Sequence, residues 1–303
     1  MLSFQIIFNL LILLFWVRLW STPANEFYFN PFLSGTVRLT DSVLAFVRPV
    51  LRLPEPVAAL LALLFIGAFK TLFLGRMGGA WTLTVGSVFH FSPASSGDLW
   101  GPHFLYSALD AALFLARFWT VYFLVVAIST QQRASRAQEA FAYFARPFSR
   151  LPFLAQPVVL LVLHGALAFA LCRSGVLTEA MAGQTAEVEK AAASPFLTSP
   201  LLVQLLKTGW LGVLSMADGL ALLTQALFIL ILGNFAAAIF QIASVTIICH
   251  EAVEMLLGRF ARNRAATGFG LDFTPLIFFF VVSMTYDGVR AGLFNLIHSP
   301  FFQ

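Results

Sequence analysis

The sequence predicts an all-α polytopic membrane protein with about six transmembrane helices, arranged as three tandem helical hairpins with interfacial amphipathic helices. Apolar residues fill 59% of the 303 positions and charged residues only 11%, whereas roughly a quarter of a soluble domain is charged. Apolar runs recur that match the length of a helix spanning about 30 Å of hydrocarbon. A charged pattern between these runs is repeated along the chain, which indicates that one hairpin unit was duplicated.

Six runs are long enough to be spanning helices: 2–20, 57–74, 104–129, 153–172, 220–249 and 271–297. They are continuous and do not alternate, which favours helices over a barrel. No Lys or Arg precedes the first run and no small-x-small cleavage pattern follows it, so we expect a retained helix. We interpret the fifth run as one tilted helix, in which Gly233 and Asn234 mark the weakest point.

A seven-position pattern occurs twice at a constant offset, between the first and second runs and again between the third and fourth. The first copy is Arg38, Asp41, Arg48, Pro49, Arg52, Leu53 and Pro54, and the second is Arg136, Glu139, Arg146, Pro147, Arg150, Leu151 and Pro152. A third, eroded copy keeps Glu251 and Arg262 at the spacing of Asp41 and Arg52. We therefore expect one membrane domain over 1–303, with repeats at about 1–76, 104–173 and 218–298 and an outer-side loop at about 174–209.

Charges in the first copy recur every three or four residues, which places them on one side of a helix and apolar residues on the other. Such a helix lies in the membrane interface. The second copy predicts the same helix, with Phe141 and Phe144 on its apolar side. Pro49 and Pro147 disfavour its continuation. Within the outer-side loop, residues 178–193 are rich in Ala, Glu and Gln and predict one short helix.

Arginine and lysine concentrate in the first, third and fifth loops, which the positive-inside rule places in the cytoplasm. Both termini are then outside, and we expect a bacterial inner membrane rather than a plastid membrane. The candidate residues for binding a partner or a lipid are Arg38, Arg48, Arg52, Arg136, Arg146, Arg150, Arg259 and Arg262. They are interpreted either as anchors that snorkel to headgroups, or as a surface that recruits anionic lipids or other integral membrane proteins. The net charge of +4 is spread too thinly for nucleic acid.

Charges within the runs are expensive in hydrocarbon. The intramembrane polar candidates are Asp110, Arg117, His164, Asp287 and Arg290. Asp110 and Arg117 are about 10 Å apart along one helix, too far to pair directly, and either could find a partner on another helix, whereas Asp287 and Arg290 can pair within a turn. His164 stands alone in its run. These charges form either ion pairs that lock helices together, or a proton or ion pathway.

Other residues near the run ends have simpler interpretations. Arg18, Lys70 and Asp272 can snorkel to the interface. Gly288 and Gly292 form a small-xxx-small step suited to close helix contact. Cys172 and Cys249 are expected to be small buried hydrophobic residues. No nucleophile–base–acid set or metal-ligand spacing is visible, so we expect no catalytic residue, no metal and no cofactor.

The repeat resembles the YggT family of small bacterial and plastid membrane proteins. The resemblance rests on Trp16, Val17 and Arg18 closing the first run, on Asn30, Pro31 and Phe32, on Arg38, Leu39, Thr40 and Asp41 continuing into Arg48 and Pro49, and on Gly270, Leu271, Asp272, Phe273, Thr274 and Pro275. Family members usually have two repeats in a shorter chain, and here the middle and last copies lack the Asn-Pro step.

The resemblance implies membrane placement and an accessory or assembly role, without a catalytic residue. We therefore expect a non-enzymatic integral membrane scaffold, assembly factor or accessory subunit of a larger membrane complex. The alternative is an ion or small-solute transporter, whose path would be lined by Asp110, Arg117, His164, Asn234 and Asp287. Its repeats would be inserted in parallel, which some transporters share.

Overall fold

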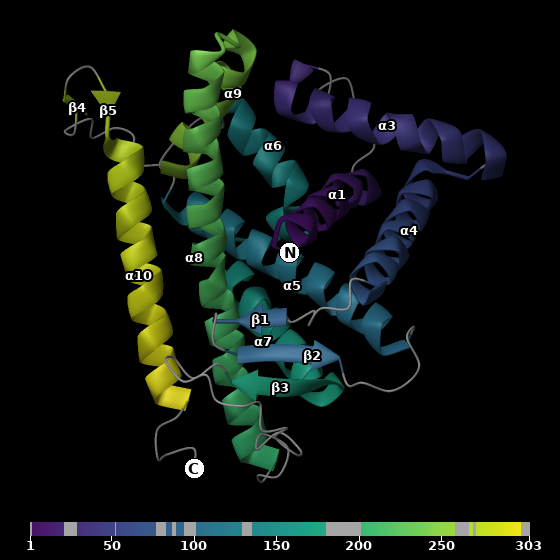
Figure 1. The fold of residues 1–303 in the computed structure, drawn as a ribbon, viewed down its shortest axis with the longest axis vertical. Coiled ribbons are helices and arrows are strands. Elements are labelled where there is room, and N and C mark those ends of the chain that lie inside the picture. The colour runs from purple at the N-terminus through teal and green to yellow at the C-terminus, as the bar shows by residue number, and fades with distance from the viewer. Residues whose placement is uncertain are drawn as a thin grey trace. The chain divides into compact units, whose positions relative to one another are not determined.

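A computed structural model describes residues 2–20, 29–51, 53–76, 83–86, 89–93, 101–128, 135–179, 201–257, 267–268 and 271–297. Helices dominate these residues (Figure 1). The α-helices are α1 (Leu2–Trp20), α3 (Pro31–Leu51), α4 (Glu55–Arg76), α5 (Gly101–Ile128), α6 (Arg136–Phe144), α7 (Gln156–Ser174), α8 (Leu201–Ile239), α9 (Ala243–Leu257) and α10 (Thr274–Ile297). The strands are β1 (Leu83–Val85), β2 (Phe89–Pro93), β3 (Gly175–Glu179), β4 (Thr267–Gly268) and β5 (Leu271–Asp272).

Five helices among the described residues are long and apolar enough to cross a membrane. Their apolar stretches are Glu55–Phe73 in α4, His103–Ile128 in α5, Gln156–Arg173 in α7, Leu205–Ala237 in α8 and Thr274–Leu296 in α10. The first predicted span also forms a helix, α1, but its described apolar stretch, Ile7–Trp20, is shorter. The predicted class of a helical membrane protein is therefore confirmed.

The chain divides into two units, each assembled from separate segments. Unit 1 comprises Met1–Leu64, Phe118–Phe153 and Leu220–Thr285, and unit 2 comprises Phe65–Arg117, Leu154–Gly219 and Tyr286–Gln303. The main core of unit 1 lies between parts of α5, α8, α9 and α10. Its buried side chains are Val121, Val125, Leu223, Leu227, Val253, Leu256, Leu257, Phe278 and Val282.

The two basic segments pack against each other in unit 1. The first is a helix, as predicted, and its buried Leu33 and Val37 contact Ala140 of α6. Asn30 precedes α3, and its side-chain amide donates to the carbonyl oxygen of Arg136 at 2.8 Å. Asn30, at the start of the first basic segment, is thereby hydrogen-bonded to Arg136, the first residue of the second.

Both helix ends differ from the prediction. Helix α3 continues through Pro49 to Leu51, so Pro49 lies in the last turn and the helix ends two residues after it. In the second copy the α-helix ends at Phe144 and a short 3₁₀ turn, Phe148–Arg150, follows Pro147. Arg146 and Arg150 therefore lie outside the helix to which the periodicity assigned them.

Unit 2 contains a small antiparallel sheet that the sequence analysis did not anticipate. Its strand order is β1-β2-β3, so β1 is an edge strand (Figure 1). Leu83, Val85, Phe89 and Phe91 are buried against helices α5, α7 and α8, with Leu214 of α8 among their neighbours. The strands thus contribute a large share of the unit 2 core.

Part of the predicted outer-side loop is strand β3 rather than loop or helix. Residues 178–179 belong to β3, where Thr178 pairs with His90 and Glu179 pairs with Phe89. They are not helical, because the chain leaves α7 directly into the sheet. The remainder of the predicted helix, 180–193, lies outside the described residues. The outer-side loop is also shorter than predicted, because α8 already begins at Leu201.

The predicted fifth span, 220–249, is wrong as a single helix. It comprises most of the second half of α8, a turn, and the start of α9. The break is at Gln241, whose φ is 56°, and the N–H of Ile242 donates to the carbonyl of Ala237 at 2.9 Å. This six-to-one bond is a Schellman closure, which ends a helix by backbone geometry, so Gly233 and Asn234 remain inside α8.

Close glycine contact occurs at a pair that the sequence did not single out. A Cβ added to Gly212 of α8 would lie 2.8 Å from the Cα and N atoms of Gly165 on α7. By contrast, a Cβ at Gly288 or Gly292 would meet open space. Among the described residues, the predicted close-contact role of Gly288 and Gly292 is therefore not found.

Candidate functional site

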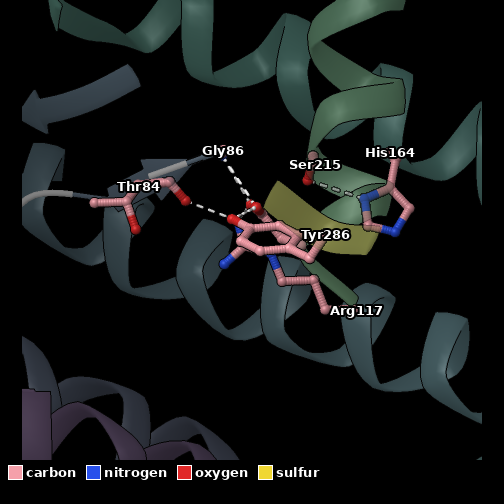
Figure 2. Close-up of polar contacts among 7 residues, drawn as sticks. Thr84, Gly86, Arg117, His164, Ser215 and Tyr286 are labelled. Atoms are coloured by element: carbon pink, nitrogen blue, oxygen red, sulfur yellow. Dashed lines mark hydrogen bonds and ion pairs between the residues drawn. The ribbon is translucent and has the colours of Figure 1, made fainter. Parts of the chain in front are cut away.

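Polar side chains from four apolar helices converge in unit 2 on the backbone of strand β1 (Figure 2). The central polar cluster is defined as Arg117 of α5, His164 of α7, Ser215 and Asp218 of α8, Tyr286 of α10, and the backbone of Thr84 and Gly86. Arg117 and His164 are two of the predicted candidates. The other members were not predicted.

Asp218 is the most heavily hydrogen-bonded member of the cluster. The N–H of Gly86 donates to its two carboxylate oxygens at 3.0 and 3.1 Å. The hydroxyl of Tyr286 donates to Oδ1 at 3.0 Å, and a guanidinium N–H of Arg117 donates to Oδ2. Donors of this kind stabilise the ionised carboxylate away from water. Asp218 precedes the fifth predicted span, 220–249, but is buried within α8.

Arg117 and Asp218 together bind two backbone groups at the edge of the sheet, one in β1 and one in the turn that follows it. Nη2 of Arg117 also donates to the carbonyl oxygen of Thr84 at 2.7 Å, while Asp218 accepts from the N–H of Gly86. An edge strand presents backbone donors and acceptors without partners, and hydrocarbon offers none. The ion pair therefore takes the place of a neighbouring strand.

Gly86 is required for this contact. Its φ is +64°, and an added Cβ would lie 2.5 Å from the side chain of Leu214. A residue with a side chain would be strained in this conformation and would displace the turn from Asp218. Glycine at position 86 therefore allows the turn to approach Asp218 closely.

His164, which stands alone in its run, is fully buried and has partners on other helices. Its Nδ1 lies 3.0 Å from Oγ of Ser215, and it hydrogen-bonds the backbone of Ala116, the residue before Arg117. The imidazole thus connects α7 with both α5 and α8. Spacing along one chain could not reveal these contacts, because Ser215 lies 51 residues away.

A second buried ion pair joins α4 to α5 in unit 2. The ammonium of Lys70 is fully buried against the carboxylate of Asp110. Nearby, the hydroxyl of Ser107 donates to the carbonyl oxygen of Gly67 at 3.2 Å. The expectation that Lys70 snorkels to the interface is wrong, because Asp110 supplies a partner inside the helix pair.

Arg18 makes a comparable contact in unit 1. Its side chain is 1% exposed, and Nη2 lies 2.5 Å from Asp41 and 2.6 Å from Glu55. These two acids belong to α3 and α4, so one guanidinium joins three helices. Arg18 is therefore also buried rather than snorkelling, and Asp41 pairs across helices in addition to lying near Arg38.

The other intramembrane candidates lie apart from the cluster. Asp287 and Arg290 pair within α10 at 3.4 Å, as predicted, and Asp287 is exposed. Asn234 belongs to unit 1. Asp272 is in β5, and its side chain lies outside the described part of the structure. Of the residues proposed to line a transport path, only Arg117 and His164 share this cluster.

Three candidate basic side chains are exposed on the packed pair of segments: Arg38, Arg136 and Arg150. The guanidinium of Arg146 lies 3.8 Å from the ring centre of Tyr143, a cation–π contact. The structure does not describe the side chains of Arg48 and Arg52, nor residues Arg259 and Arg262. We name these three exposed arginines of the two packed segments the basic platform.

Metal ligands do not gather in groups of three or more among the described His, Cys, Asp and Glu residues. Cys172 and Cys249 are buried and unbridged, as expected for small hydrophobic residues. Comparison of the chain with protein-family models, with curated proteins and with solved structures gives no match.

Proposed function

We propose that the protein is a non-enzymatic integral membrane scaffold, assembly factor or accessory subunit of a larger membrane complex. The observation that supports this most directly is the direct packing of α3 on α6, which brings two basic segments next to each other. A single surface with several guanidinium groups suits anionic headgroups and the acidic segments of a membrane partner.

The buried charges support a structural rather than a reactive interior. Lys70, Arg117 and Arg18 each contact at least one carboxylate on another helix. Pairs of this kind hold helices in register, and removal of one member leaves a charge in a medium of low dielectric constant. A framework fixed in this way is suited to presenting an external surface.

The proposal places the basic platform on the cytoplasmic side of a bacterial inner membrane. Its support is the positive-inside pattern and the contact between the two segments, which requires them to lie at the same side of unit 1. The resemblance of the repeat to the YggT family agrees with an accessory role.

Purification in a mild detergent, followed by native mass measurement, tests the proposal. We expect the protein to co-purify with another integral membrane protein, and the R38E/R136E/R150E variant to lose that partner while inserting normally. The R173E variant changes an exposed charge at the end of α7, outside the platform, and serves as the control. A wild-type protein that is purified only as a bare monomer would contradict the proposal.

Transport of an ion or small solute is the second candidate, and one observation favours it. His164 lies beside Arg117 in the middle of two apolar helices, and a buried histidine next to a charged group is a usual element of proton relays. Flux into liposomes that is lost in both the Asp110→Asn and His164→Gln variants would favour this candidate over the scaffold.

A further inference from the structure

The turn after β1 contacts residues far from the ends of the apolar stretches that are long enough to cross a membrane. Its partners lie far from the ends of the apolar stretches: Arg117 is 14 residues from His103 and 11 from Ile128, and Tyr286 is 12 residues from Thr274 and 10 from Leu296. At 1.5 Å per residue each is about 15 Å or more from either end. Half the hydrocarbon thickness is also about 15 Å. Because Gly86 contacts Asp218 of this cluster, strand β1 is re-entrant.

One face of this strand is apolar and buried, whereas the other is open. Leu83 and Val85 are 2% and 0% exposed, and Thr84 between them is exposed. Figure 2 shows the Thr84 carbonyl directed toward Arg117 and its side chain directed away from the cluster. His90 is the cross-strand neighbour of Thr84 and is partly buried. Residues that are paired across antiparallel strands lie on the same face, so the open face is polar.

Two environments could surround this open face, and the backbone decides between them. Extended backbone at membrane depth is tolerated when it is buried in protein or lines a water-filled space, but not when it faces lipid. Thr84 is not buried, and the side chain of Arg117 beside it is 19% exposed. We infer that a water-filled vestibule reaches Thr84 at the middle of the membrane.

The vestibule opens at the end where the strands join the helices. Strands β1 and β2 lie between the last residue of α4 and the first residue of α5, and β3 follows α7 directly. These ends belong to one side in a hairpin arrangement, the side predicted to be outside. The Arg117–Asp218 pair carries no net charge, so the vestibule suits water and small neutral polar solutes.

Cysteine accessibility tests this inference in the full chain. In a background that carries C172A and C249A, T84C is treated in intact membranes with a membrane-impermeant methanethiosulfonate reagent. The control is F65C, because Phe65 is 72% exposed and lies near the middle of the apolar stretch of α4. A thiol reacts as the thiolate, which forms in water and not in lipid, so we expect T84C to react roughly tenfold faster or more.

N-ethylmaleimide, added after the membranes are dissolved and the protein is unfolded in SDS, then confirms that both thiols are intact, and reaction from only one side of the intact membrane identifies the opening. Equal resistance of T84C and F65C to the impermeant reagent would overturn the inference, because Thr84 would then face lipid. The vestibule does not depend on the proposed scaffold. Unreactive T84C would remove the vestibule and leave partner binding intact, whereas absence of a partner would leave the labelling unchanged.

Discussion

The ammonium of Lys70 on α4 is fully buried against the carboxylate of Asp110 on α5. Seven residues further along α5, Arg117 contacts Asp218 of α8. Helix α5 therefore carries an acid and a base seven residues apart, and each of them pairs with a different neighbouring helix.

Replacement of Lys70 by methionine should destabilise the protein, because it leaves Asp110 without its cation. Removing one member of a buried pair typically costs about 3–5 kcal/mol. The K70M/D110L variant, in which both charges are gone, should recover most of the loss. Thermal unfolding in detergent compares the three proteins. If the K70M/D110L variant were as unstable as K70M, the Lys70–Asp110 pair would stabilise the protein by more than the cancelling of two buried charges.

Gly86→Ala should lower stability by about 1–2 kcal/mol, the usual cost of a left-handed conformation for a residue with a Cβ. The contact with Leu214 adds to this cost. Gly209→Ala in α8 is the matched control, because its added Cβ meets nothing within 4 Å, and alanine in a helix is preferred to glycine. Equal Tm values for the two variants would show that the turn has no close fit against α8.

The glycine pair between α7 and α8 predicts an asymmetric response. Gly212→Ala brings a Cβ against the backbone of Gly165 and should cost about 1–3 kcal/mol, as overpacking does. Gly165→Ala should be tolerated, because its Cβ would meet nothing within 4 Å. The two variants are compared by thermal unfolding. Equal sensitivity would contradict the close approach of these helices.

Asn30 has two separable roles at the start of α3. Its Oδ1 accepts from the N–H of Phe32 at 3.1 Å, and its amide donates to Arg136. Asn30→Asp keeps the first contact and loses the second, whereas Asn30→Ala loses both. The alanine variant should lose about 0.5–2 kcal/mol for the cap and should also weaken partner binding. If the Asn30→Asp variant binds the partner as the wild-type protein does, the hydrogen bond to Arg136 does not hold the basic platform together.

Several elements could be predicted from the sequence because they depend on local patterns. The bounds of α1 match the first apolar run, and the three-to-four spacing of charges correctly indicates helix α3. The Asp287–Arg290 pair also follows from spacing alone. These features need only the periodicity of a helix and a few neighbouring residues.

The site depends on contacts that no local pattern specifies. Asp218 resembles a loop charge until Gly86, 132 residues earlier, is placed against it. Thr84 and Gly86 occur in a segment with little periodicity, so the strands were missed. Arg18 and Lys70 were predicted to snorkel to the interface, because that prediction needs only their position near the end of an apolar run. Their burial depends on acids on other helices, which the sequence alone does not place beside them.

The free edge of β1 also constrains the order in which the chain is assembled during synthesis. The turn at Gly86 emerges from the ribosome 132 residues before the carboxylate that receives it, and β3, which completes the sheet, follows α7. Strand β2 and Arg117 of α5 are made soon after β1, but until α8 has entered the bilayer the N–H of Gly86 lacks its acceptor, Asp218. Final closure of unit 2 is therefore a late event, which begins only after the membrane helices that surround it have been delivered.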